Sequence, residues 1–132
     1  MTDVVIIAHR GIGEAFRAVA EVILDRDIDI TVLPVREGDD PGCSLERLAS
    51  ALARWRDAEP PLIMTDLPGA TPHNLAMKAA GRVLGDVPIL TGMNLPMLLR
   101  ALNHSQQPAA ALAELAAHGA HAATFIGEHL ED

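Results

Sequence analysis

The sequence is poor in aromatic residues and in basic charge. Aromatic side chains make up 2% of the 132 residues, and tyrosine is absent. A surface that stacks nucleobases needs several aromatic rings. The formal net charge is −8, from 18 acidic and 10 basic residues, whereas nucleic-acid binding needs a basic footprint. We therefore expect no nucleic-acid partner, while the acidic balance permits a basic protein partner.

Cysteine is also scarce, and long apolar runs are missing. The one cysteine, Cys43, excludes an internal disulfide and fits a reducing compartment. No apolar run approaches the roughly 18 residues that span a bilayer, and no basic-then-apolar leader pattern follows Met1. We expect a cytoplasmic protein without stable membrane insertion, folded as one domain over residues 1–132. A chain of this length can fold without disulfides or metals.

Apolar runs alternate with segments of helical periodicity. Val4 to Ala8 is a continuous apolar run, typical of a strand buried on both faces. Apolar residues then recur at helical spacing from Ile12 to Ile23. Further strands are expected at 28–35, 62–65, 87–90 and 120–126, and further helices at 44–56, from 71, at 94–103 and at 108–118. This order predicts an α/β fold with a mainly parallel central sheet and helices on both faces.

The strands of such a sheet end at a common edge, where ligand chemistry gathers. Three segments rich in glycine, proline and polar residues are expected to meet there: His9, Asp66 to Asn74, and Thr91 to Pro96. The first follows the first strand, the second follows the third strand, and the third follows the fourth. The sequence therefore predicts a site at this edge.

The residue types at this edge suit phosphoryl transfer through a histidine. A histidine that carries phosphate must keep one ring nitrogen unprotonated, and a carboxylate can hold the proton on the other. His9 and Asp66 occupy equivalent positions on two strands. Thr71 is expected to be the N-cap of a helix with Pro72 at its first position, and its hydroxyl either caps the helix or touches phosphate. Gly69 lets the backbone approach closely.

Each of these features also has an ordinary structural explanation. A histidine after a strand is often a simple hydrogen-bonding residue, and the segments from Asp66 and from Thr71 match a common turn and a common helix start. Their meeting at one edge favours a phosphate site, with no metal or cofactor implied. A dinucleotide site is disfavoured. Gly11 and Gly13 resemble the start of that fingerprint, but Phe16 stands where glycine or alanine is needed.

At these positions the chain resembles the IIA domain of the mannose-type family of the bacterial phosphoenolpyruvate-dependent sugar phosphotransferase system. The resemblance covers the whole chain in order and spacing, and its most specific segments are 65–74 and 92–98. It implies a parallel sheet with one antiparallel strand, which corresponds to the C-terminal strand expected at 120–126, and a homodimer. It also implies phosphorylation of His9, with Asp66 as its partner, and a phosphate contact from the Thr71 hydroxyl. We expect Gly69 and Ala70, which directly precede Thr71, to belong to the phosphate site as well. The phosphocarrier protein HPr would be the donor and a IIB component the acceptor.

Three residues depart from the family pattern. Arg10 stands where the family has glycine, Pro68 stands where an aromatic residue is frequent, and His73 replaces a cysteine or apolar residue. Arg10 either holds phosphate through its guanidinium or points into water. We expect a phosphocarrier for sugar uptake. The alternative is a regulatory binding module whose phosphorylation state signals to a protein partner, and the sequence does not name a sugar.

Overall fold

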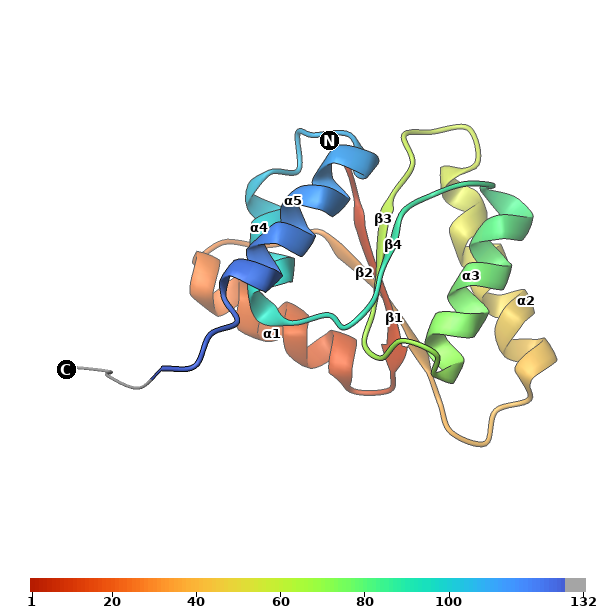
Figure 1. Ribbon diagram of the computed structural model, residues 1–132. Coiled ribbons are helices and arrows are strands. Elements are labelled where there is room, and N and C mark those ends of the chain that lie inside the picture. The colour runs from red at the N-terminus through yellow and green to blue at the C-terminus, as the bar shows by residue number, and fades with distance from the viewer. Residues whose placement is uncertain (128–132) are drawn as a thin grey trace.

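The computed structural model describes residues 1–127, which fold around a four-stranded parallel sheet (Figure 1). In spatial order the strands are β2 (Ile30–Val35), β1 (Val4–His9), β3 (Leu62–Thr65) and β4 (Ile89–Leu90). The helices are α1 (Ile12–Leu24), α2 (Pro41–Leu52), α3 (Thr71–Val83), α4 (Leu95–Asn103) and α5 (Ala109–Ala122), with a 3-10 helix η1 (Ala53–Trp55) after α2. The α/β fold and the parallel sheet expected from the sequence are confirmed. No helix in the described part of the chain is both long and apolar enough to cross a membrane.

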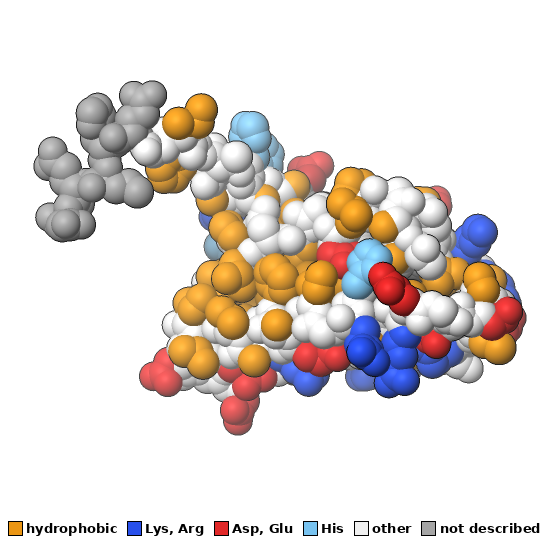
Figure 2. Space-filling view, turned by 90° about the horizontal axis from the view of Figure 1, so that it is seen from below, with side chains coloured by type: hydrophobic (Ala, Val, Ile, Leu, Met, Phe, Trp, Pro, Cys, Tyr) orange, Lys and Arg blue, Asp and Glu red, His pale blue; other side chains and the backbone are white. Residues whose placement is uncertain are grey.

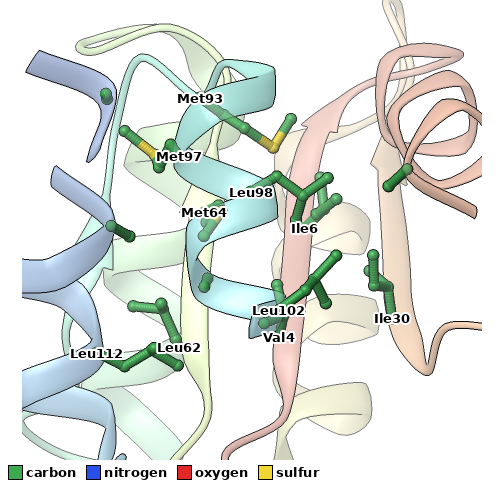
Figure 3. Packing of buried hydrophobic residues seen from close by; sticks show 14 of the residues in the cluster. Val4, Ile6, Ile30, Leu62, Met64, Met93, Met97, Leu98, Leu102 and Leu112 are labelled. Atoms are coloured by element: carbon green, nitrogen blue, oxygen red, sulfur yellow. The ribbon is translucent and has the colours of Figure 1, made fainter. Parts of the chain in front are cut away.

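Helices cover both faces of the sheet, as the sequence predicts. In Figure 1, α1, α4 and α5 lie on one side of the strands, and α2 and α3 lie on the other. Successive side chains of β1 enter the two resulting cores in turn: Val4 and Ile6 join one cluster, and Val5 and Ile7 join the other. Figure 3 shows Ile6 beside Leu98 and Val4 beside Leu102. Both faces are covered, so the run from Val4 onward is apolar without alternation.

The connections leave β1 and β3 toward opposite sides of the sheet. The segment after β1 leads through α1 to β2, whereas the segment after β3 leads through α3 to β4, on the other edge. Such a switch point opens a crevice beyond the carboxyl ends of the two strands. The register pairs Ile7 with Thr65, so His9 and Asp66 emerge next to each other.

The glycines after β1 serve packing and chain reversal. Gly11 lies at the start of α1 with φ of 96°, a left-handed conformation that glycine adopts readily. A Cβ at Gly13 would approach a methyl group of Val32 to 2.6 Å. The close packing of α1 against β2 therefore explains Gly13 without a bound dinucleotide.

The prediction of a strand over residues 120–126 is wrong. Residues Ala120 to Ala122 belong to α5, and residues 123–127 have no regular structure. Alanine is the strongest helix former, and Thr124 closes the helix end by donating its hydroxyl to the Ala120 carbonyl at 3.0 Å. The antiparallel strand is therefore not formed, and all four strands described here run parallel. Residues 128–132 of the expected domain lie outside the described part.

Candidate functional site

His9 and Asp66 form a hydrogen-bonded pair at the carboxyl edge of the sheet. His9 ends β1, and Asp66 directly follows β3. The Nδ1 atom of His9 lies 2.6 Å from Oδ2 of Asp66. The backbone N–H of His9 donates to the same carboxylate oxygen at 3.1 Å. The two residues that the sequence predicts as partners thus lie in direct contact, and two bonds to one oxygen fix the ring relative to the strand end.

This geometry determines which ring nitrogen is available for chemistry. A carboxylate oxygen only accepts hydrogen bonds, so the short contact places the proton on Nδ1 of His9. In the neutral ring, Nε2 then carries the free lone pair. The His9 side chain is 38% exposed, whereas that of Asp66 is 9% exposed. The His9 side chain is thus partly exposed, while the residue that fixes the orientation of its ring is shielded.

Asp66 stays ionised in spite of its shielding. Burial raises the pKa of this carboxyl, but hydrogen bonds from the side chain and backbone of His9, together with its charge, outweigh burial and hold the pKa below the ordinary 3.8. The second oxygen, Oδ1, is buried and has no hydrogen-bond partner among the described residues. The carboxylate is thus available to offset positive charge that develops on the ring.

The loop after Asp66 is braced by the first turn of α3. The Gly69 N–H donates to Nδ1 of His73 at 2.9 Å, and the side-chain amide of Asn74 donates to the Gly69 carbonyl at 3.2 Å. Gly69 has φ of 79°, in the region that glycine favours. The Gly69 N–H is therefore engaged by His73, a contact that the sequence did not predict. No hydrogen bond links Gly69, Ala70 or Thr71 to His9 within the described residues.

The start of α3 differs from the prediction by one residue. Ala70, in extended conformation, is the N-cap, and Thr71 is the first helical residue. No side chain caps the helix, because alanine at the N-cap position has no side-chain oxygen to accept a hydrogen bond. The assignment of Thr71 as N-cap is wrong. Its exposed hydroxyl lies at a helix N-terminus, where free N–H groups favour an anion.

The third segment expected at the edge has a structural role. The Met93 N–H donates to the Thr65 carbonyl at 3.0 Å, which ties this segment to the end of β3. The Asn94 side chain accepts a hydrogen bond from the Met97 N–H at 2.9 Å and caps α4. Asn94 is thus already engaged at the helix start.

His9 lines a pocket of about 460 Å³. Arg10 lines it, as does Arg36, which sequence reasoning missed; Val35, Glu37 and Asp39 complete the wall. Arg36 follows a different strand and belongs to no motif, so only the register of β1 and β2 could have indicated it. Figure 2 looks onto this edge and shows basic and acidic side chains gathered beside a histidine. Among the described residues, no group of three or more histidine, cysteine or acidic side chains is arranged to hold a metal ion.

Comparisons with known proteins agree with this geometry. The model of the family described as PTS (phosphotransferase system) system fructose IIA component matches residues 3–119. The mannose/sorbose specific IIA subunit of the phosphotransferase system from Enterococcus faecalis is 24% identical, with a TM-score of 0.84 over 99% of this chain and 98% of that chain. The phosphotransferase system component EIIA from Streptococcus agalactiae is 22% identical, with a TM-score of 0.80 over 96% of this chain and 97% of that chain.

A third solved structure also has a similar fold. The PTS IIA protein associated with the fucose utilization operon from Streptococcus pneumoniae is 20% identical, with a TM-score of 0.77 over 96% of each chain. No curated protein matches the chain in sequence. At these identities the structural likeness shows the fold, whereas the family model covers most of the chain. The chain therefore belongs to the IIA family of the sugar phosphotransferase system, the family that its histidine, aspartate and loop motifs resemble.

Proposed function

We propose that this protein is a cytoplasmic phosphocarrier that accepts a phosphoryl group on Nε2 of His9. The donor is the phosphohistidine of HPr, and the acceptor is a IIB component in a sugar uptake system. Family membership places the chain in phosphoryl transfer within the sugar phosphotransferase system. The observation that carries the proposal is the 2.6 Å contact between Nδ1 of His9 and Asp66, because it leaves Nε2 as the nucleophile.

The reaction is a displacement between two nitrogen atoms. The Nε2 lone pair of His9 attacks phosphorus, and a new N–P bond forms as the N–P bond of the donor histidine breaks. The electron pair of the broken bond stays on the donor nitrogen. Positive charge develops on the His9 ring during attack, and the Asp66 carboxylate stabilises it across the Nδ1–H bond. Catalysis then consists of positioning and electrostatic stabilisation.

The phosphoryl oxygens need donors beside Nε2. We assign this role to the Thr71 hydroxyl, to the N–H groups in the first turn of α3, and to Arg10. The N–H groups of Gly69 and Ala70 already donate to His73 and to the Leu67 carbonyl. The Thr71 hydroxyl is exposed and does not cap α3, so it is available to an anion. Arg10 lines the same pocket as His9, which supports a phosphate contact over a side chain directed only into water.

We also propose that the protein is a homodimer through the α1 side. Val22 is 80% exposed, Ile23 52% and Val19 43%, and an apolar groove formed by Ala15, Phe16, Val19 and Leu95 lies beside them. Figure 2 shows hydrophobic side chains gathered on the side of the molecule that carries α1, α4 and α5. A contiguous apolar patch of this kind marks an association surface.

The test uses purified protein with phosphoenolpyruvate, enzyme I and HPr. We expect the intact mass to increase by one phosphoryl group, and we expect acid to remove the label, as it does from phosphohistidine. His9→Ala is expected to remain unlabelled and folded, because His9 is half-exposed and adds little to the core. His104→Ala serves as the matched control and is expected to be labelled like the parent. Label that persists on His9→Ala would refute the assignment.

A further inference from the structure

Two arginines follow the last paired residues of β1 and β2 and line the same pocket as His9. The strands pair in parallel register as far as His9 opposite Val35, and the Arg10 N–H donates to the Val35 carbonyl at 3.0 Å. Arg10 and Arg36 are therefore the next residues along the two chains. Both line a pocket of about 460 Å³ that His9 also lines, and this volume is larger than that of a phosphoryl group.

These two guanidiniums are not engaged by the described residues. Neither Arg10 nor Arg36 forms a side-chain hydrogen bond or ion pair with the described part of the chain, although acidic residues line the same pocket. By contrast, Arg82 forms a bidentate pair with Glu46 at 2.8 Å, and Arg47 donates to the Pro34 carbonyl at 2.8 Å. Two unengaged cations beside a nucleophilic histidine are suited to an anion.

We propose that Arg10 and Arg36 form a guanidinium pair that holds the oxygens of the phosphoryl group on Nε2 of His9, with Arg36 as a specific phosphate-binding residue of this chain. The inference rests on the proposed function, since it concerns the phosphorylated state of His9. A guanidinium presents several N–H donors in a planar fork that matches phosphate oxygens. Each arginine approaches from its own strand end, so the two can contact the phosphoryl group from different directions.

The acidic residues of the pocket explain why a second cation is needed. Glu37 and Asp39 lie on the same turn as Arg36, which is closed by a hydrogen bond from the Asp39 N–H to the Arg36 carbonyl at 3.4 Å. Arg10 alone would face two carboxylates together with the negative phosphoryl group, and like charges repel. With Arg36 present, two guanidiniums balance the two carboxylates, so the net charge of these four side chains is zero. The guanidinium N–H groups then remain as hydrogen-bond donors to the phosphoryl oxygens.

The experiment measures the equilibrium of the phosphoryl group between HPr and this protein. That equilibrium depends on the stability of the two phosphorylated states and not on how fast the partners dock. Parent, Arg36→Ala and Arg36→Lys are each mixed with phosphorylated HPr, and the labelled fractions are read by intact-mass spectrometry at low and high salt. Arg56→Ala is the matched control and removes the same charge far from His9. Arg56 follows Trp55 at the end of η1, and the Trp55 ring N–H donates to Asp3, which precedes β1 at the end opposite His9.

We expect Arg36→Ala to shift the equilibrium toward phosphorylated HPr by about tenfold at low salt. This effect is at the lower end of the range for hydrogen bonds to charged groups, because Arg36 is exposed and water and salt weaken its interaction with phosphate. The Arg36→Lys equilibrium should lie between those of the parent and Arg36→Ala, because an ammonium keeps the charge but lacks the planar set of N–H donors of a guanidinium. Arg56→Ala should match the parent, and the melting temperature should not change in any variant. If Arg36→Ala and Arg56→Ala give the same equilibrium as the parent, the inference is overturned while the proposed function stands. If the parent protein takes no phosphoryl group on His9, the proposed function itself is refuted, and the inference about Arg36 is refuted with it.

Discussion

Replacing Asp66 by asparagine tests how the carboxylate orients the ring. The change keeps the shape of the side chain and removes its charge. In the structure, Oδ2 accepts from Nδ1 of His9 at 2.6 Å and from the His9 N–H at 3.1 Å, while Oδ1 is buried without a described partner. An amide can place its oxygen or its NH₂ group at the Oδ2 position, and both orientations impair the site.

The two orientations fail for different reasons. With oxygen facing His9, both hydrogen bonds survive, but the charge that stabilises the ring is lost and a buried NH₂ group has no partner. With NH₂ facing His9, the amide donates to Nδ1, and the ring proton moves to Nε2, where it blocks attack. We expect the transfer rate to fall by about 10³- to 10⁴-fold, as for an orienting carboxylate in a hydrolase triad. The free energy of unfolding should fall by about 1–3 kcal/mol for the unsatisfied group.

The assay is single-turnover transfer from phosphorylated HPr, stopped by rapid quench, with stability followed by thermal melting. Asp86→Asn is the matched control, because Asp86 is exposed and forms no ion pair with a described residue. It should transfer like the parent. An Asp66→Asn rate equal to that of the parent would show that the contact between His9 and Asp66 is not needed for transfer.

The Thr71 hydroxyl, the Asp66 carboxyl and the exposed Val22 can each be tested separately. Thr71→Val should slow transfer about tenfold and leave the melting temperature unchanged, because the hydroxyl does not cap α3; a large drop in stability would show that it does. The pKa of Asp66 lies below 3.8 in the folded protein, so the carboxyl binds a proton more readily in the unfolded chain. The stability that Asp66 contributes is therefore present above about pH 4 and is lost as pH falls through the folded pKa. The difference in melting temperature between the parent and Asp66→Asn should shrink below that pH, and a constant difference would contradict the sign. Val22→Glu, at a side chain that is 80% exposed, should turn a dimer into a monomer in sedimentation, and an unchanged sedimentation coefficient would exclude the α1 surface.

The parts of the fold that depend on local pattern are predictable from the sequence. The continuous apolar run from Val4 marks a strand covered on both faces, and the structure buries it from both sides. Asn94 followed by Leu95 and Pro96 starts a helix where expected. The pairing of His9 with Asp66 is predictable as well, because parallel strands bring their carboxyl ends to one edge.

The errors arise where the outcome depends on distant contacts or on one residue of register. Thr124 to Ile126 have strand-like composition, but a strand needs a neighbour to pair with, and none of the described strands pairs with them. Thr71 and Ala70 differ by one position at the start of α3, and the extended backbone of Ala70 makes it the cap. Arg36 reaches the site only through the β1–β2 register, and the contact between His73 and Gly69 depends on a loop conformation.

We propose that Asp66 engages Nδ1 of His9 and thereby leaves Nε2 to bind phosphorus. The most direct test is a nitrogen-15 NMR spectrum of the phosphorylated protein labelled at histidine, which distinguishes phosphorylation at the two ring nitrogens. We expect the phosphorus coupling on Nε2 of His9 and a protonated Nδ1. Phosphorus on Nδ1, the atom that lies 2.6 Å from the carboxylate, would contradict the account.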